Sequence, residues 1–429
     1  MASWARSAAG GADHGRPVML TRLLALVATL TLALAGAAPA MAQGGPIKIG
    51  LLTPLTGAAS ALGKDMLGGT ELYLDEIGRQ VAGRKIELIV EDTEGVTATA
   101  LTKARKLVDQ DRVHILTGGL LASTGYAIHP FADGAKIPTT YPVMSSDDLT
   151  QRKPAKWVVR TGWNSSQSMH AFGEWVAKNL KHRKIAVVAF DYAFGWESVG
   201  GFQRTFEEQG GQIVQKIWVP LSTTDFAPFL AQIKRDADAV FAVFFGRGSL
   251  QFVKQYAESG LKTKLPLLGN GTVTDESVLP QMGDEALGVH TALHYSAALD
   301  NPANQKFAKA FEAKMSKVPS YYGETCYTNA RWIVEAIKAI NGKVEDREAF
   351  LAALRKVELK DFPRGPVVID RWGNPIQNIY VRKVERVGGH LQNSVLFTYP
   401  TVSQFWKYNP EEFLKQPLYT RDHPPCKYC

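Results

Sequence analysis

The chain has 429 residues, of which 45% are hydrophobic, and its 49 basic and 41 acidic residues give a formal net charge of +8 at pH 7. The basic residues are dispersed, without the stripe or the aromatic interleaving of a nucleic-acid surface, so we expect no nucleic-acid partner. Beyond the N-terminal segment no apolar run approaches the about 18 residues that span a membrane.

The first 42 residues are typical of an export signal. Leu23 to Ala35 is an apolar core too short to span a bilayer comfortably, and Ala40-Met41-Ala42 fits the small-x-small cleavage rule. Met19 begins a signal of ordinary proportions and is an alternative start. Cleavage after Ala42 predicts an exported, periplasmic protein of residues 43–429, which is long enough for two domains of about 100–200 residues each.

From Ile47 onward short apolar strands alternate with helical patterns, which predicts an α/β fold with parallel sheets. The first series has strands at 47–53, 84–91, 113–117, 137–141 and 157–161. A second series has strands at about 184–190, 213–219, 239–245, 265–269 and 289–295. Helical patterns at about 301–318, 323–340 and 346–356 precede a strand and tight turn at 367–374. The aromatic tail from Tyr399 is expected to wrap around the protein as an arm.

Loops rich in small residues follow these strands. Ligands of open α/β sheets bind beyond the carboxyl ends of the strands, so we expect the loops to face a ligand. Ser123 or Thr124 is a natural N-cap, and the exposed amides behind it favour an anionic group. The loops of the second series are predicted at 191–195, 246–249 and 269–272.

Arg247 stands between glycines after the apolar strand Val240 to Phe245. A guanidinium at the carboxyl edge of a sheet suits a ligand carboxylate, with about 1.5–3 kcal/mol for each charge-assisted bond. The alternative is a solvated loop arginine. Aromatic walls for the same ligand are predicted from the following side chains, each of which is otherwise explained as core: Trp163, Tyr192, Phe194 and Tyr322.

Other chemistries find little support in the sequence. The spacing of Gly57 and Gly63, with Asp65 after the lysine, does not fit a phosphate-binding loop. His290 and His294 lie about 13 Å apart on a strand, too far for one metal. There is no G-x-S-x-G elbow, although a scattered hydrolase triad remains open. We therefore expect no enzyme, no cofactor and no metal site.

Three cysteines follow the predicted signal. In an oxidising compartment Cys426 and Cys429 can form a disulfide, or one of them can reach Cys326, and one thiol is left over. Two cysteines without a second pair argue against zinc.

A family resemblance rests on short motifs whose order and spacing are specific together. These are Ile47-Lys48-Ile49-Gly50, Thr56-Gly57, Gly68, Asp92, Ser123, Leu149-Thr150, Arg160-Thr161, Ser165-Ser166-Gln167, Tyr192-Ala193-Phe194-Gly195, Asp225-Phe226, Gly260-Leu261 and Asn301-Pro302-Ala303-Asn304. By them the chain resembles the type I periplasmic binding proteins of the leucine/isoleucine/valine-binding kind, the solute receptors of bacterial ABC importers.

The resemblance implies two doubly wound α/β lobes that close on a solute, with hinge crossings near 161–166, 291–297 and 357–363. Lobe I would be 43–163 plus 295–358, and lobe II would be 164–294 plus 359–429. It also implies a membrane permease as partner, and we expect a monomer.

In similar receptors, matching loops of both lobes form the ligand site. With Trp163 from the aromatic set, the predicted ligand-binding residues are Leu62, Leu121, Ala122, Ser123, Met144, Ser145, Trp163, Phe194, Arg247, Gly248, Asn270 and Gly271.

One departure from the family bears on the ligand. Amino-acid receptors of this family hold the substrate ammonium with an acidic residue near the position of Gly271, where this chain has Gly269-Asn270-Gly271-Thr272. A buried, unpaired ammonium costs several kcal/mol, so we predict a small organic acid, of an aromatic kind. The alternative is a branched-chain or other amino acid held by Asp275 or Glu276. A ligand sensor or a secreted hydrolase is a further alternative.

Overall fold

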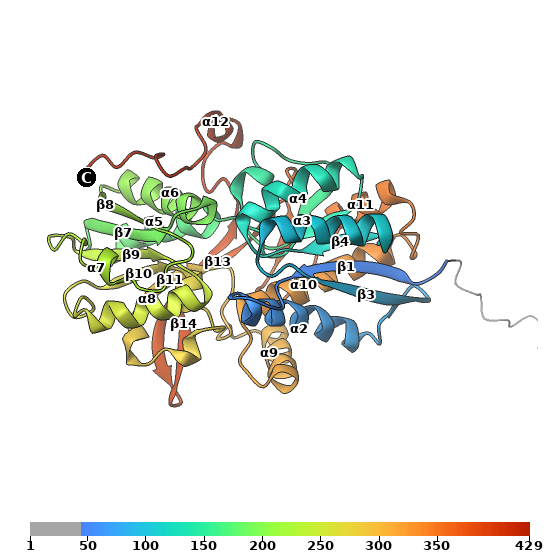
Figure 1. The fold of residues 1–429 in the computed structure, drawn as a ribbon, viewed down its shortest axis with the longest axis horizontal. Coiled ribbons are helices and arrows are strands. Elements are labelled where there is room, and N and C mark those ends of the chain that lie inside the picture. The colour runs from blue at the N-terminus through green and yellow to red at the C-terminus, as the bar shows by residue number, and fades with distance from the viewer. Residues whose placement is uncertain (1–43) are drawn as a thin grey trace, which may run out of the picture. The chain divides into compact units, whose positions relative to one another are not determined.

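The computed structural model describes residues 44–429, and Pro46–Cys429 form one compact unit (Figure 1). The predicted export signal at 1–42 and the alternative start at Met19 lie outside the described residues. Among residues 44–429, no helix has both the length and the apolar character needed to cross a membrane.

The first sheet has the order β2-β3-β1-β4-β5-β6 and is parallel except for the β2–β3 pair. Its strands are β1 (Ile47–Thr53), β2 (Gln80–Val81), β3 (Arg84–Asp92), β4 (Ile115–Gly118), β5 (Thr139–Tyr141) and β6 (Val158–Arg160). Its crossover helices are α2 (Ser60–Glu76), α3 (Thr97–Arg105), continued by the π-turn η1 (Lys106–Gln110), and α4 (Ala122–Gly134). Because helices cover both faces, β1 and β4 are buried almost without alternation.

The second sheet has the order β12-β13-β11-β10-β9-β7-β8, and β14 pairs with β13. Its strands are β7 (Lys184–Phe190), β8 (Gln212–Val219), β9 (Ala239–Val243), β10 (Leu267–Asn270), β11 (His290–Leu293), β12 (Val367–Ile369), β13 (Pro375–Val387) and β14 (His390–Val402). The helices around it are α5 (Gln167–Asn179), α6 (Ala193–Glu208), α7 (Ala227–Leu230) and α8 (Gly246–Glu258), with 3-10 turns η3 (Gly271–Thr274), η4 (Leu279–Gln281) and η5 (Asp284–Ala286).

Three helices between β11 and β12 return to the first sheet: α9 (Pro302–Met315), α10 (Tyr321–Ala339) and α11 (Arg347–Lys356). Helix α10 packs along α2, and α9 contacts α2 as well. A Cβ atom built on Gly69 of α2 would lie 2.0 Å from the carbonyl oxygen of Gly323, so this close approach of two helices requires glycine. The chain then crosses back to add β12, β13 and β14 to the second sheet.

The predicted α/β class is confirmed, with three differences. The long β13–β14 hairpin was not predicted, because β13 mixes polar and apolar residues and pairs with β11 and β12, while β14 pairs with β13. The predicted loop at 246–249 is the first turn of α8, and most of the predicted loop at 191–195 is the first turn of α6. One short element of the first series completes the list: the 3-10 turn η2 (Asp147–Leu149) lies between β5 and β6.

The C-terminal tail beyond β14 packs against the molecule and carries one short helix, α12 (Pro410–Lys415), capped by Asn409. Its aromatic residues form a small core of their own around Phe405, Phe413 and Tyr419. Of the pairings that the sequence left open, Cys426 is bonded to Cys429, and Cys326 is a buried free thiol.

Candidate functional site

A small cavity lies beyond the carboxyl ends of strands from both sheets, and we call it the inner cavity. It is lined by Leu120, Leu121, Ala122, Val143, Ser145, Trp163, Tyr192, Phe194, Phe245, Thr272, Tyr321 and Tyr322. These residues follow β4, β5 and β6 of the first sheet and β7, β9 and β10 of the second, or begin α10, as expected for a ligand site of α/β sheets. Its volume of about 20 Å³ has room for about one water molecule.

Three helices begin at the inner cavity without a side-chain cap. They are α4, α6 and α8, and their N-cap residues Leu121, Tyr192 and Phe245 all line the cavity. The amide N–H groups of a helix's first turn have no partner within the helix, and the helix dipole adds a partial positive charge there. The chain reaches α4 through Gly119, whose φ of +81° suits glycine. Three uncapped N-termini therefore give this cavity a positive potential that favours an anion.

No charged side chain lines the inner cavity among the residues that the structure describes. Its side-chain donors are the hydroxyl groups of a serine, a threonine and three tyrosines, together with the indole N–H of Trp163. Burial raises the pKa values of Tyr192 and Tyr321 well above the ordinary value of 10, and that of Tyr322 is raised by the same cause. The phenols therefore stay protonated at neutral pH and can donate hydrogen bonds.

The Trp163 indole is held at the cavity by aromatic contacts. Its ring packs edge-on against Phe194 and Tyr321, with centroids 5.9 Å and 5.8 Å away. Its Nε1 atom is buried and has no hydrogen-bond partner within the described chain. Leaving a buried donor unpaired costs about 1–3 kcal/mol of free energy. A ligand oxygen that accepts from this N–H would remove that penalty.

Ser145, which follows β5, is held in position by hydrogen bonds from Ser165, which precedes α5. The backbone N–H and the hydroxyl of Ser165 both donate to its carbonyl oxygen, at 2.8 Å and 3.0 Å, and the two hydroxyl oxygens lie 3.1 Å apart. On the opposite wall the hydroxyl of Thr272 donates to the carbonyl oxygen of Phe244. These bonds hold two short polar side chains in defined positions at the cavity.

The acidic residues nearest this wall have other partners. Asp275 accepts hydrogen bonds from the backbone N–H of Ser277 at 2.9 Å and from that of Tyr321 at 3.0 Å. Burial, with the charge of Glu276 beside it, raises the pKa of Asp275 to about 7. Neither acidic residue lines the inner cavity. Asp275 instead anchors the first turn of α10, which carries two of the cavity's tyrosines.

A second cavity, of about 240 Å³, adjoins the first, and we call it the outer cavity. Leu121 and Phe245 line both cavities. Arg247 lines only the outer one, in the first turn of α8, and its side chain is exposed. The guanidinium therefore lies at an approach to the inner cavity and not among the side chains that enclose it.

The twelve predicted ligand-binding residues fall into three groups. Those lining the inner cavity are Leu121, Ala122, Ser145, Trp163 and Phe194. Those lining the outer cavity are Leu62, Arg247 and Gly248, again with Leu121. Those whose side chains or backbone line neither are Ser123, Met144, Asn270 and Gly271.

The residues of the third group have structural contacts. The Ser123 hydroxyl lies 3.3 Å from the hydroxyl of Thr97 on α3, and Met144 belongs to a core cluster. The Asn270 side chain caps η3 by accepting from the backbone N–H of Thr272 at 3.1 Å. The Gly271 carbonyl oxygen accepts from the Arg382 guanidinium at 2.7 Å.

Five lining residues were missed by sequence reasoning: Leu120, Val143, Phe245, Thr272 and Tyr321. Leu120, Val143 and Thr272 are each next to a predicted site residue, so extending each predicted loop by one residue would have included them. The prediction began the helix at 323, two residues after the start of α10. The available signal was Ser320, whose side chain caps α10 by accepting from the backbone N–H of Gly323. Recognising that cap would have placed the Tyr321-Tyr322 pair at a helix N-terminus.

The histidines weighed as metal ligands have other surroundings. His294 is buried, its Nε2 atom lies 3.0 Å from the Thr325 hydroxyl, and burial lowers its pKa well below 6.5. Residues 44–429 contain no group of three or more His, Cys, Asp or Glu side chains placed to hold a metal ion.

The sequence of the chain is similar to that of known proteins. The sequence profile of the family described as periplasmic binding protein matches residues 46–389. The Leu/Ile/Val-binding protein homolog 6 of Brucella melitensis is 30% identical, over 84% of this chain and 93% of the relative.

Two solved structures share both fold and sequence with the chain. One is the solute-binding protein of an ABC transporter from Rhodopseudomonas palustris BisB5 in complex with 3,4-dihydroxybenzoic acid, with a TM-score of 0.80 and 35% identity over 84% of this chain and 98% of that one. The other is a solute-binding protein of an R. palustris ABC transporter in complex with benzoate, with a TM-score of 0.78 and 32% identity over the same shares.

Proposed function

Because the chain belongs to the periplasmic binding protein family, the family of the Leu/Ile/Val-binding proteins, we propose that it is the solute receptor of an ABC importer and binds an aromatic carboxylic acid in the inner cavity. The observation that carries the ligand class is that three uncapped helix N-termini meet at an aromatic cavity, to which the described part of the chain contributes no charged side chain. The helix ends supply the attraction for the carboxylate, and the rings supply the apolar wall.

The carboxylate would lie at the first turn of α4. The backbone N–H groups of Ala122 and Ser123, the Ser145 hydroxyl and the Trp163 indole would donate to it. Hydrogen bonds to a charged group contribute about 1.5–3 kcal/mol each, so neutral donors are sufficient without an arginine. The aromatic ring would pack between Phe194 and Tyr321, where edge contacts between rings add about 0.5–1.5 kcal/mol.

An amino acid is the second candidate, because the curated relatives are named Leu/Ile/Val-binding proteins. It needs an acceptor for its ammonium group at the same place. Asp275 already accepts from two backbone N–H groups, and the positive helix ends disfavour a cation. These two points favour the acid, as do the benzoate-type ligands of the solved relatives.

The test of the ligand class is isothermal titration of the purified protein with benzoate, 4-hydroxybenzoate and 3,4-dihydroxybenzoate. At least one acid should bind with a Kd in the micromolar range or tighter, near −8 kcal/mol. Mass spectrometry of the denatured protein would identify any co-purified ligand independently. The absence of binding by all three acids, together with binding of leucine, would refute the aromatic-acid assignment.

We also propose that the protein has two lobes, of residues 43–163 plus 295–358 and of residues 164–294 plus 359–429, which part to admit the ligand. The division is supported by the two sheets and by the packing of α9 and α10 on α2. The inner cavity draws residues from both sets, and its volume of about 20 Å³ is too small for a six-membered ring. Entry of a ligand therefore requires the walls to separate.

Hinge closure predicts a change in size. Small-angle scattering should give a larger radius of gyration for the ligand-free protein than for the protein saturated with the acid identified by titration. Glycerol or another non-binding solute at the same concentration serves as the control. An unchanged radius on saturation would contradict closure.

Replacement of the Ser145 hydroxyl tests the position of the carboxylate. Ser145→Ala should weaken binding by about 1 kcal/mol or more, because a hydrogen bond to a charged group is lost. Ser123→Ala is the matched control: its backbone N–H is kept, and its hydroxyl lies beside Thr97. Calorimetry should therefore show little change for Ser123→Ala. A larger loss for Ser123→Ala than for Ser145→Ala would place the ligand elsewhere.

The cellular role follows from the family. We propose that residues 1–42 direct export, that the mature protein acts in the periplasm as a monomer, and that it delivers its ligand to a membrane permease. Uptake of the identified acid by cells lacking the gene should fall, and plasmid-borne wild type should restore it. Normal uptake with an altered transcriptional response would indicate a sensor instead.

A further inference from the structure

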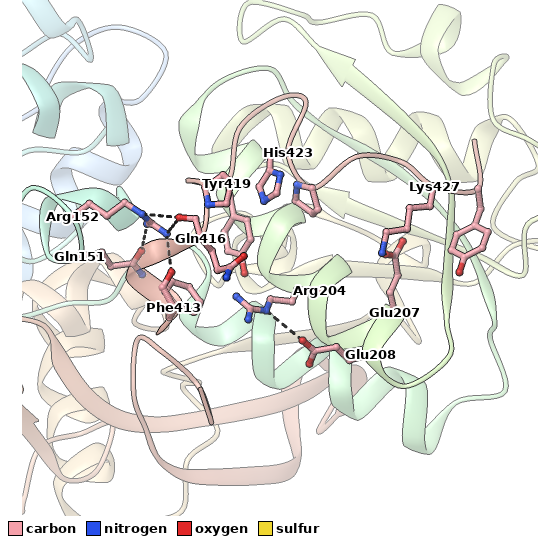
Figure 2. A pocket seen from close by; sticks show the side chains of 13 residues that line it. Gln151, Arg152, Arg204, Glu207, Glu208, Phe413, Gln416, Tyr419, His423 and Lys427 are labelled. Carbon is pink, nitrogen blue, oxygen red and sulfur yellow. Dashed lines mark hydrogen bonds and ion pairs between the residues drawn. The ribbon is translucent and has the colours of Figure 1, made fainter. Parts of the chain in front are cut away.

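A larger cavity lies under the C-terminal tail (Figure 2), and it shares no lining residue with the inner cavity. We call it the tail cavity, and its volume is about 350 Å³. It is enclosed by the segment before β6, by α6 and by the tail. Its lining residues include Gln151 and Arg152 from the first, Arg204, Glu207 and Glu208 from the second, and Phe413, Tyr419, His423 and Lys427 from the third.

The tail is fixed over this cavity by hydrogen bonds to helices α5 and α6 and to Arg152. The Tyr419 hydroxyl lies 3.0 Å from Nε2 of His170, and Gln203 donates to the Pro425 carbonyl oxygen at 2.9 Å. Arg152 donates to the carbonyl oxygens of Gln416 and Phe413, at 2.8 Å and 3.2 Å. The cavity is thus a built feature, and its tail lining, from Phe413 to Tyr428, lies beyond the 46–389 span of the family profile.

One polar group in the lining has no partner. The Gln151 side chain is 2% exposed, and its amide Nε2 atom has no hydrogen-bond partner in the described chain. Its Oε1 atom accepts from Arg152 at 3.1 Å, which fixes the amide so that Nε2 is the free donor. A buried unpaired donor costs about 1–3 kcal/mol unless an acceptor reaches it.

The same end of the cavity is rich in positive charge. Gln151 and Arg152 lie at one end with Tyr419 and His423, Arg204 of α6 lies between this end and Lys427, and Lys427 lies at the far end beside Glu207 (Figure 2). The two glutamates are already paired, Glu207 with Lys427 at 3.8 Å and Glu208 with Arg204 at 3.3 Å.

The positive charges near this end of the cavity also affect the protonation of His423. Burial lowers the pKa of His423, and the charges of Lys216, Arg152 and Arg204 lower it further. Asp148, whose carboxylate lies 3.6 Å from Arg152, offsets part of that charge. Positive potential with an unpaired N–H donor is the chemistry that recognises an oxyanion.

We propose that the tail cavity is a second binding site, for a small anion bearing a carboxylate or phosphate group. Gln151 Nε2 donates to the oxyanion, the positive charges of Arg152 and Arg204 attract it, and Phe413 and Tyr419 form the apolar wall beside it. A volume of about 350 Å³ lies within the range of about 300–1,000 Å³ of small-molecule sites. The site is independent of the ligand assigned to the inner cavity.

The test measures binding of inorganic phosphate and of citrate by calorimetry and by thermal unfolding, with sodium chloride matching the ionic strength, because an anion that binds the folded state raises the unfolding temperature. Gln151→Glu keeps the shape of the side chain and the acceptor for Arg152 but replaces the free donor with a negative charge. It should weaken anion binding at least tenfold. Arg204→Gln keeps a planar group over Tyr408 and should weaken binding as well.

The control is Arg79→Gln, at a partly exposed, ion-paired arginine next to α2 that lies outside the lining of the tail cavity. It should bind phosphate and citrate as the wild type does. Phosphate binding without citrate binding would assign the site to free phosphate, and the reverse to a carboxylate.

Equal affinity in wild type and Gln151→Glu would overturn the proposal, as would failure of both anions to bind the wild type. Benzoate binding should be unchanged in Gln151→Glu, so failure at this site is distinguishable from failure of the ligand assignment at the inner cavity.

Discussion

Phenylpropionate should bind at least about a hundredfold more tightly than phenylalanine, a difference of about 2.7 kcal/mol. The two molecules differ only in the α-ammonium group. Binding would place that group at three uncapped helix N-termini in a cavity that has no acidic side chain in its lining within residues 44–429. Desolvating an ammonium without a partner costs several kcal/mol. A competition titration of the two ligands measures the ratio directly.

Two further comparisons separate charge from shape. Benzamide, the neutral counterpart of benzoate, should bind more weakly than benzoate because it lacks the carboxylate that the helix ends attract. Arg247→Gln should change the Kd of benzoate little and slow its association at low salt, because the exposed guanidinium lies at the outer cavity. A loss of about 2 kcal/mol or more in Arg247→Gln would instead support the direct carboxylate contact predicted from sequence.

Tight binding of phenylalanine or leucine would contradict the organic-acid assignment. It would restore the amino-acid function of the Leu/Ile/Val-binding relatives, with Asp275 or Glu276 turning toward the ammonium. Asp275→Asn would then reduce leucine binding and leave benzoate binding unchanged.

Arg382→Met should destabilise the protein by about 3–5 kcal/mol. The Arg382 guanidinium is fully buried and donates to the carbonyl oxygens of Tyr295 and Gly271, each at 2.7 Å, and to the Thr291 hydroxyl at 3.2 Å. Methionine fills much of the volume but leaves these oxygens unpaired. It also removes the positive charge near Asp275 and Glu276. Urea unfolding, with the slope of the transition checked for two-state behaviour, measures the loss.

Arg386→Met is the matched control on the same strand. Arg386 lies near the end of β13, where it forms an exposed ion pair with Asp284. Exposed ion pairs contribute about 0–1 kcal/mol, so this variant should unfold close to the wild type. Equal losses in the two variants would show that Arg382 does not anchor the Gly271 turn, and with it Thr272 of the inner cavity.

Local sequence was sufficient for the elements whose cause is local. The apolar run at 184–190 predicted β7 with both of its bounds. A strand that is covered on both faces is a continuous apolar run, so the ends of the run mark the ends of the strand. Small-residue loops marked the carboxyl ends of the strands, and five of the twelve predicted ligand-binding residues line the inner cavity. By contrast, the β13–β14 hairpin was missed, because β13 is placed by pairing with β11, which is distant in sequence.

The sequence by itself determined the α/β class, the two series of strands and the strand ends at which a ligand site can form. Only the tertiary structure decided which residues of those ends face the cavity. Ser123 and Ser145 look alike in sequence, yet Thr97 on another helix lies against the first, while Ser165 positions the second at the cavity. Tyr321 joins the same wall from far along the chain. The physical reason is that the direction of a side chain in a short turn depends on packing against segments that lie far away in sequence.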